Sequence, residues 1–305
     1  MPQYRKMLDS QETQDPMFQT IHYSLANHQI AALVDSVNDA LNSPPLIMLH
    51  GVLRRGSDFV PMFPALGSHW KIYALDQRGH GSSSRVAGRY FVRDYVGDVV
   101  AWIQANFAHP VAIYGHSLGA MVALGAAAQL STQCKAVILE DPPFETMGTH
   151  IESTPFHSQF AGLTKIVRPG RSLDEILPEL ACMPITIPHK GITVPFGQLR
   201  DSVALRFMAS CLTHVDPDVL LPIVAGRWLE GYDWQSAAQQ LQCPSLLLQA
   251  DWDAGGMLTD DDAQSFAQHA RGSHVIRIPQ VGHQMHWQAT EAVLRTVLAF
   301  LESTR

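Results

Sequence analysis

Short apolar runs recur along the chain and alternate with segments of helical pattern. Six of them have the length of buried strands, at residues 45–50, 71–75, 111–114, 136–139, 245–249 and 275–278. Strands that alternate with helices are typical of a parallel sheet covered on both faces. Residues 20–24 and 29–34 add an antiparallel pair at one edge. The pattern predicts an α/β fold, with a mostly parallel eight-stranded sheet flanked by helices.

Apolar residues at helical spacing mark two of the helices. One stripe consists of Val96, Val99, Val100, Ile103 and Phe107, and the other consists of Val293, Leu294, Val297, Leu298 and Leu301. Such a stripe is the buried face of an amphipathic helix. Asp94 is predicted to cap the start of the first helix.

The alternation stops between about residues 144 and 242. This stretch is rich in proline and contains helical pieces, such as residues 201–211, but no strand–helix rhythm. A structureless loop of that length is improbable in a compact domain. We therefore expect a core domain at residues 1–143 and 243–305 and an inserted helical cap at residues 144–242.

Composition and charge narrow the range of partners. The 305 residues are 46% hydrophobic and carry a net charge of −7, so the chain lacks the basic footprint that binds nucleic acid or anionic membranes. Residues 1–15 contain no apolar leader pattern, and no apolar run has the length of a membrane span. We expect a cytoplasmic monomer or homodimer with a small-molecule substrate.

The four cysteines give no sign of a metal or redox centre. Cys134, Cys182, Cys211 and Cys243 are far apart in the sequence and form no CxxC pair, so we expect reduced, buried thiols. No metal-ligand spacing or phosphate-binding loop appears either. We therefore expect no metal and no cofactor.

The segment Gly115-His116-Ser117-Leu118-Gly119 follows a strand run and opens a helix rich in small residues. This is the context of the G-x-S-x-G nucleophile elbow, where a sharp turn projects the serine hydroxyl from the sheet edge. Side chains two residues before or after the serine would collide there. Ser117 is therefore the predicted nucleophile.

A serine nucleophile needs a base, and the base is oriented by an acid. His283 lies between the last strand run and the last helix, which places it at the same sheet edge, and it is preferred to His286. The acid should lie between Ser117 and His283 in the chain. Asp253 is the preferred acid. The alternatives are Asp251, in the same loop, and Glu140 or Asp141, after the preceding strand.

Acyl transfer also needs backbone N–H donors aimed at the developing oxyanion. The predicted donors are the N–H groups of Leu118 and Val52. Gly51 lets the backbone approach the substrate, and His50 is expected to hold this loop by hydrogen bonds.

Together these segments resemble the α/β-hydrolase superfamily, in its serine esterase and lactonase-like branch with a cap. The matching pieces are HGVLRRGSDF (50–59), LDQRGHGSS (75–83), YGHSLGAM (114–121), LLLQADWD (246–253) and VGHQMHW (281–287). The resemblance implies that Arg78 and His80 brace the loops beneath the site. Relatives that open epoxides or remove halides have an aspartate at the elbow, so Ser117 disfavours those activities. Val52 replaces the aromatic residue of cofactor-free haloperoxidases.

The substrate pocket should lie between the sheet edge and the cap. Its candidate walls are His50, Gly51, His116, Trp252 and Trp228, with Arg54 as a possible carboxylate contact; Arg54 and Arg55 are alternatively surface ion-pair residues. Trp228, Tyr232 and Trp234 suit an apolar or aromatic substrate, or they fill the contact between cap and core. The predicted reaction is hydrolysis of a carboxylic ester or lactone. Acyl transfer, C–C bond cleavage and ligand sensing are the alternatives.

Overall fold

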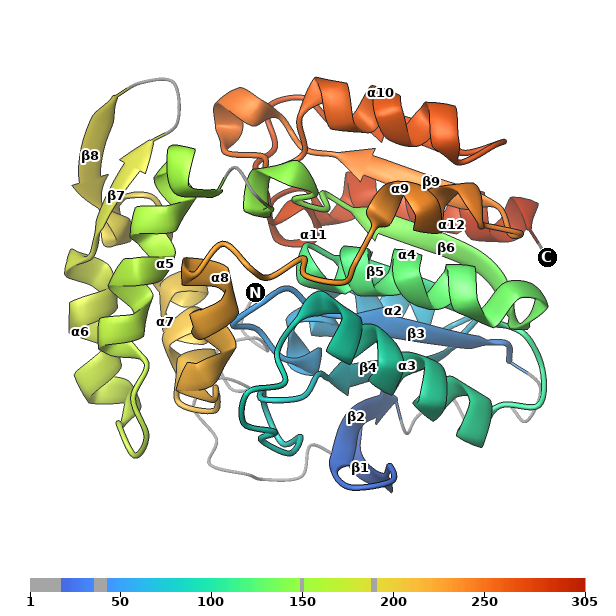
Figure 1. Cartoon of the computed structure of the whole chain (residues 1–305), viewed down its shortest axis with the longest axis horizontal. Helices are drawn as coiled ribbons and strands as arrows, with labels where there is room; N and C mark the ends of the chain where they lie inside the picture. Colours follow the sequence, from blue (N-terminus) through green and yellow to red (C-terminus); the bar gives the residue numbers. More distant parts are fainter. Residues whose placement is uncertain (1–17, 36–42, 149–150, 188–190, 305) are drawn as a thin grey trace.

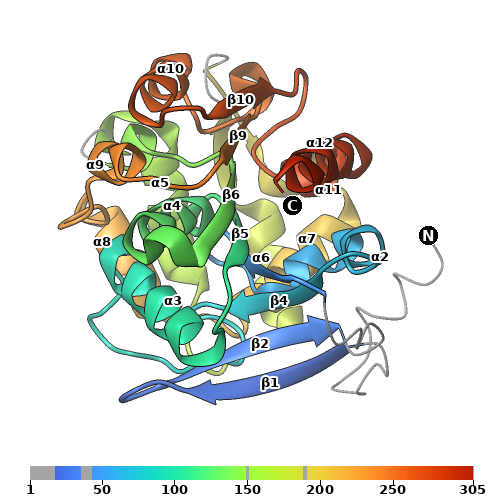
Figure 2. The same cartoon turned by 90° about the vertical axis from the view of Figure 1, so that its right-hand side faces the viewer.

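The computed structural model describes residues 18–35, 43–148, 151–187 and 191–304. Its centre is an eight-stranded sheet in the order β1-β2-β4-β3-β5-β6-β9-β10, with helices on both sides (Figures 1 and 2). The strands are β1 (Phe18–Ser24), β2 (Gln29–Asp35), β3 (Pro45–Leu49), β4 (Lys71–Asp76), β5 (Val111–His116), β6 (Cys134–Glu140), β9 (Ser245–Gln249) and β10 (His274–Arg277).

Every strand predicted from the apolar runs is present in this sheet. The pairings from β4 to β10 are all parallel, and β2 pairs antiparallel with both β1 and β4. The predicted antiparallel edge pair and the predicted α/β class are therefore confirmed. Because parallel strands share one direction, the loops after β3, β5, β6 and β9 leave the sheet at the same edge.

The sheet separates two apolar cores, one under each helical layer (Figure 2). One face carries α3 (Val92–Asn106), α4 (Leu118–Leu130) and α10 (Asp260–His269). The other carries η1 (Gly56–Met62), α2 (Phe63–Leu66), α11 (Met285–Gln288) and α12 (Thr290–Ser303). In α12 the predicted stripe faces inward, with Val293, Val297 and Leu301 buried.

The start of α3 differs from the sequence expectation. The helix begins at Val92, and Asp94 occupies its third position rather than capping it. Its carboxylate Oδ2 reaches back to accept the backbone N–H of Phe91 at 3.1 Å. Asp94 thus still satisfies an otherwise free N–H at the helix start, although the helix begins three residues earlier than predicted.

The segment between β6 and β9 contains mainly helices, and it also contains a β-hairpin. Its elements are α5 (Pro155–Ile166), α6 (Leu173–Cys182), β7 (Pro184–Ile187), β8 (Ile192–Pro195), α7 (Ser202–Leu212), α8 (Leu221–Val224) and α9 (Trp234–Gln239). The antiparallel β7–β8 pair was not predicted. Elements α5 to α8 form a lobe beside the sheet, whereas α9 packs on α4 and α10 (Figure 1).

Two further expectations concern membranes and thiols. No single described helix is long and apolar enough to cross a membrane; residues 202–212 and 217–224 pass together on length and composition but are bent by 108°. Residues 1–15, which were expected to carry no leader, lie outside the described residues. All four cysteines are free, although Cys182 is exposed rather than buried, and the Sγ atoms of Cys134 and Cys243 lie 3.6 Å apart.

Candidate active site

Ser117 stands on the sharp turn between β5 and α4. Its φ of 55° lies in the left-handed region, and its side chain is nearly buried. The flanking glycines make the turn possible, because a Cβ at Gly115 would come within 2.0 Å of the Gly119 carbonyl oxygen. A Cβ at Gly119 would come within 1.9 Å of the Leu49 carbonyl oxygen. The predicted collision at both flanking positions is therefore real.

His283 lies in the loop before α11, and its ring contacts a carboxylate from another strand end. The Nδ1 atom of His283 is 2.6 Å from Oδ2 of Asp141, which follows β6 and is fully buried. The Asp141 carboxylate also accepts the backbone N–H groups of Ala250, Met257 and Leu258 at 2.8–3.3 Å. These bonds to the charged form fix the carboxylate and hold the His283 ring in one orientation.

The prediction that Asp253 orients His283 was wrong, because the carboxylate that contacts the His283 ring is that of Asp141. Asp253 is exposed, and its backbone N–H donates to Oδ1 of Asp251. Asp251 in turn accepts the N–H of Gln280 at 2.8 Å, so it holds the turn after β9. Strand β6 lies between β5 and β9 in the sheet, and its end is therefore closer to the elbow. Asp141 was one of the alternatives, and the only sequence signal for it was an acidic pair directly after a buried strand.

His116 and Gly51 bring the elbow and the His283 loop together. The Nε2–H of His116 donates to the His283 carbonyl oxygen at 2.9 Å, and the two rings lie 4.7 Å apart. A Cβ at Gly51 would sit 2.9 Å from Nδ1 of His116 and 3.2 Å from Cβ of Ser117. Burial lowers the pKa of His116 to about 3, so this ring is a neutral positioning group.

We expect Gly51→Ala to disturb this arrangement without unfolding the protein. The added methyl group displaces the His116 ring, and a misplacement near 1 Å at a reacting centre costs roughly 100-fold in rate. We therefore expect kcat to fall by roughly 10- to 100-fold in an ester assay. Gly97→Ala is the matched control, because nothing lies within 4 Å of the added Cβ. Equal activity in both variants would contradict the prediction.

The loop after β3 is held by two histidines, as predicted for His50. The Nδ1–H of His50 donates to the Gly51 carbonyl oxygen at 2.8 Å, and its Nε2 accepts the Gln77 N–H at 3.0 Å. His80 accepts the N–H of Leu53, which has a φ of 65°. Burial lowers the pKa of His50 to about 3 and that of His80 to about 4. Both rings are therefore neutral and structural.

The two predicted oxyanion donors come from different parts of the chain. Leu118 is the first residue of α4, where backbone N–H groups have no partner within the helix. Val52 lies in the loop after β3 and lines the same cavity as Ser117. Their role as donors stays a prediction.

Beneath the elbow lies a buried cluster of charged side chains that the sequence did not reveal. Arg54 forms a two-pronged contact with Asp58 at 2.7 and 3.0 Å, so it is a buried rather than a surface ion-pair residue. His286 lies between Asp58, at 3.4 Å, and Glu140, at 2.8 Å. Tyr114 and the backbone N–H of His286 also donate to Glu140.

The pKa values of this cluster favour a fully charged state. Burial alone lowers the pKa of His286, but Glu140 and Asp58 more than offset this and raise it to about 9. Burial raises the pKa of Glu140, yet His286 and His116 lower it to about 2. Two carboxylates, one guanidinium and one imidazolium then balance to zero net charge.

The same region contains the one described group of side chains with the spacing of metal ligands. Candidate ligand atoms of Asp58, His116 and His286 lie within 4.8 Å of one another. The Arg54 guanidinium, however, already neutralises Asp58, and the raised pKa of His286 favours a proton on its ring. The arrangement thus suits a proton better than a divalent cation.

A cavity of about 120 Å³ opens over Ser117 and His283. One water needs about 10–15 Å³, so this space admits a small organic molecule. Of the predicted wall residues, Gly51, His116, Arg54 and Trp228 line it, whereas Trp252 and His50 do not. Further walls that the sequence did not single out come from the lobe and neighbouring loops; they include Met147, Phe156, Gln159, Phe160, Leu163, Phe196, Arg200 and Met208.

The other aromatic residues of the late cap segment join this segment to the core. The Tyr232 hydroxyl donates to the Met121 carbonyl oxygen at 2.7 Å. The Trp234 ring stacks on Phe144 at 4.2 Å and lies edge-on to the His269 ring of α10, with 6.2 Å between the ring centres. The packing alternative was therefore correct for Tyr232 and Trp234, whereas Trp228 faces the cavity.

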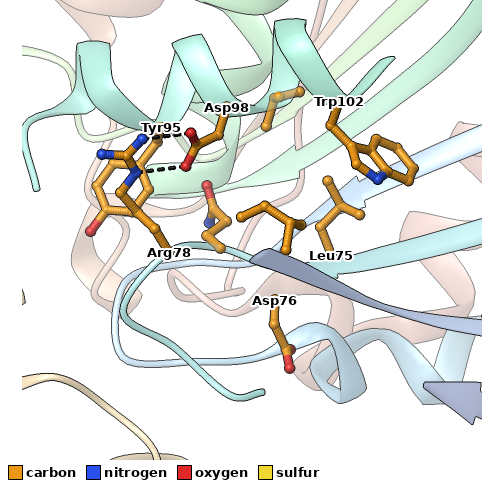
Figure 3. A pocket seen from close by; sticks show the side chains of 9 residues that line it. Leu75, Asp76, Arg78, Tyr95, Asp98 and Trp102 are labelled. Atoms are coloured by element: carbon orange, nitrogen blue, oxygen red, sulfur yellow. Dashed lines mark hydrogen bonds and ion pairs between the residues drawn. The ribbon is translucent and has the colours of Figure 1, made fainter. Parts of the chain in front are cut away.

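A second, much smaller cavity lies between β4 and α3 (Figure 3). It measures about 10 Å³, and beside it Arg78 donates to Asp98 at 2.6 Å. Asp76, the last residue of β4, accepts the N–H groups of Gly56 and Ser82. Arg78 and His80 thus act as structural braces, as the resemblance implied.

Comparison with known proteins agrees with this architecture. The model of the alpha/beta hydrolase family matches residues 46–296. The (E)-2-((N-methylformamido)methylene)succinate hydrolase of Acinetobacter baylyi is 29% identical, over 85% of this chain and 91% of that protein. The solved structure of E-2-(acetamidomethylene)succinate hydrolase has a TM-score of 0.72 at 17% identity and covers 93% of this chain and 99% of that one.

Other matches are shorter. The 2-(acetamidomethylene)succinate hydrolase of Mesorhizobium japonicum is 28% identical over 41% of this chain. The chain spans 46% of the length of that relative and 37% of epoxide hydrolase B of Mycobacterium tuberculosis. The family match, which spans most of the chain and all strands from β3 to β10, shows that this protein belongs to the alpha/beta hydrolase family.

Proposed function

We propose that the chain hydrolyses a carboxylic ester or lactone of a small molecule through Ser117, His283 and Asp141. The observation that carries this proposal is the 2.6 Å contact between Nδ1 of His283 and the buried Asp141 carboxylate. This contact leaves Nε2 of His283 available as a base, in a ring that lines the same cavity as Ser117. A serine with such a partner is an activated nucleophile.

The proposed reaction has two halves. Oγ of Ser117 attacks the carbonyl carbon while its proton passes to Nε2 of His283, and Asp141 stabilises the imidazolium. The oxyanion accepts hydrogen bonds from the N–H groups of Val52 and Leu118. The bond to the leaving oxygen then breaks, and that oxygen takes the proton from His283.

Water completes the cycle. It attacks the acyl-serine carbonyl while His283 removes its proton, and the proton returns to Ser117 as the acyl bond breaks. The sum is ester plus water giving acid plus alcohol. In a lactone the alcohol and the acid remain one molecule.

Hydrolysis of an amide is a second candidate, and the comparison with relatives favours it. The Acinetobacter relative is named for a succinate that carries an N-methylformamido group, and its match spans most of both chains. Oγ of Ser117 can attack an amide carbonyl in the same way, with His283, oriented by Asp141, protonating the leaving nitrogen. Acyl transfer, C–C bond cleavage and ligand sensing have no comparable support.

Active-site labelling tests the nucleophile. A fluorophosphonate probe is expected to label the wild-type protein covalently, and Ser117→Ala is expected to abolish labelling because the attacking oxygen is gone. Ser131→Ala, at the other end of α4, is the control and should label normally. Labelling that persists in Ser117→Ala would refute the assignment.

Substrate panels then separate the reaction classes. Wild-type protein is assayed with short-chain aryl esters, lactones and N-formyl or N-acetyl enamides. Turnover of esters or lactones supports the main proposal, and turnover of enamides alone supports the amide alternative. Rapid labelling without turnover of any class would count against hydrolysis.

A further inference from the structure

The polar walls of the cavity over Ser117 are basic rather than acidic. Among the residues described as lining it, Arg54 and Arg200 are charged cations, and none is aspartate or glutamate. Arg54 is already neutralised by its two contacts with Asp58. Among the described residues, Arg200 is therefore the cation of this cavity that forms no ion pair, in a chain whose net charge is −7.

The surroundings of Arg200 leave most of its hydrogen-bonding groups unused. The residue lies between η5 (Phe196–Gln198) and α7, and it is half-buried. Its Nη1 donates to the Leu199 carbonyl oxygen at 2.9 Å, and its guanidinium lies 5.3 Å from the centre of the Phe196 ring. A guanidinium has five N–H donors. In the described parts of the chain, no ion pair occupies them.

The neighbouring carboxylate is already engaged. Oδ1 of Asp201 accepts the N–H groups of Val203 and Ala204 at 2.9 Å and so caps α7. Burial lowers the pKa of Arg200, and the nearby charge of Arg54 acts in the same direction, whereas Asp201 acts in the opposite one. A bound anion would relieve both effects, because burying a cation is costly unless the cation is paired.

The rest of the lobe side of the cavity is apolar. Phe156, Phe160, Leu163 and Met208 line it together with the ring of Phe196. The cavity therefore offers a nucleophile in one wall, an apolar middle and an unneutralised guanidinium. This combination fits an amphipathic molecule better than a wholly apolar one.

We propose that Arg200 binds a carboxylate of the substrate, so that the enzyme prefers an ester, lactone or amide that carries a free acid group. The reaction part of this statement rests on the proposed function, but anion binding by Arg200 requires no turnover. Arginine suits the role because its planar fork matches the two oxygens of a carboxylate.

Binding to the inactive variant Ser117→Ala tests the proposal apart from catalysis. The ligands are the monomethyl and dimethyl esters of succinic, glutaric and adipic acid, and calorimetry measures Kd. At one or more chain lengths, we expect the monoester to bind at least tenfold more tightly than the diester. Adding Arg200→Gln should weaken monoester binding about tenfold and leave diester binding unchanged. Arg200→Lys should retain part of the preference.

Arg227→Gln is the matched control, because Arg227 is exposed, pairs with Glu230 and does not line the cavity. Two results would overturn the proposal: no monoester preference at any chain length, or equal weakening of monoester and diester by Arg200→Gln. Failure of the proposed function has a different signature, since it would appear as absent fluorophosphonate labelling and absent turnover while the monoester preference remained.

Discussion

Replacing Asp141 with asparagine is expected to lower kcat for ester hydrolysis by roughly 10⁴-fold, the size of effect seen when a triad aspartate loses its charge. Oδ2 of Asp141 accepts the proton on Nδ1 of His283 at 2.6 Å. An amide nitrogen at that position donates instead, which moves the ring proton to Nε2 and removes the base. In the wild-type chain Oδ2 of Asp141 also accepts the Met257 N–H. An amide nitrogen in place of Oδ2 cannot accept this N–H, so some stability should be lost as well.

Asp253→Asn is the matched control for this experiment. Asp253 is exposed, and its backbone N–H donates to Asp251 in the turn after β9, so kcat should stay within about twofold of wild type. Thermal unfolding of both variants separates loss of the base from loss of fold. Near-normal activity in Asp141→Asn, or a large loss in Asp253→Asn, would contradict Asp141 as the acid and favour a carboxylate in the loop after β9.

The two acids illustrate what the sequence can and cannot predict about the site. The proposed roles of Ser117 and His283 could be predicted because the elbow and the last strand–helix loop have fixed places in this fold. The carboxylate that contacts His283 could not, because two loops that begin at the same sheet edge each carry a pair of carboxylates. Burial, the contact with His283 and the three N–H groups that converge on Asp141 distinguish it from Asp253. Those groups come from residues 250–258, more than a hundred positions away.

In the fold, too, features marked by a clear pattern in one short stretch of sequence were predictable, and features formed by residues far apart in the chain were not. The central strands β3, β5, β6 and β9 were predictable because each contains a short apolar run that lies buried between two helical layers. The β7–β8 hairpin was not, since each of its strands has only four residues, and apolar runs this short do not by themselves indicate a strand. The charged cluster beneath the elbow was also missed: Asp58, Glu140 and His286 come from three separate parts of the chain, and only the folded sheet brings them together.

Replacing His286 with leucine is the second change with a large expected effect. The imidazolium lies between Asp58 and Glu140, and all three side chains are 0% exposed. Its loss leaves two buried carboxylates with a single guanidinium, Arg54. Removing one partner of a buried ion pair typically costs 3–5 kcal/mol, so we expect about that loss in the free energy of unfolding at pH 6.5.

Two comparison variants identify the cause of the loss. His69→Leu replaces an exposed histidine and should change stability by less than about 0.5 kcal/mol. The double variant His286→Leu/Glu140→Gln removes the carboxylate that is left without a cationic partner and should recover part of the stability, as expected for coupled charges. A double variant that is less stable than the sum of its parts would contradict an electrostatic origin.

The pH dependence of unfolding provides an independent test of the same cluster. In the folded chain the pKa of His286 is raised to about 9, against 6.5 for an ordinary histidine, so its contribution is fully present below pH 6.5 and disappears as the pH rises through 9. The lowered pKa values of His50, His80 and His116, at about 3 to 4, act in the opposite direction. Their contribution is present above pH 6.5 and is lost as the pH falls.

Denaturant unfolding should therefore show maximum stability near pH 6.5 in the wild-type protein. The decline between pH 6.5 and 9 should be smaller in His286→Leu, because that variant has no buried proton to release, whereas the decline on the acid side should remain. An unchanged alkaline slope in His286→Leu would mean that His286 is neutral in the folded chain. Asp58 and Glu140 would then share only the charge of Arg54, and the ring would be available as an acceptor beside His116 rather than as a cation beneath the elbow.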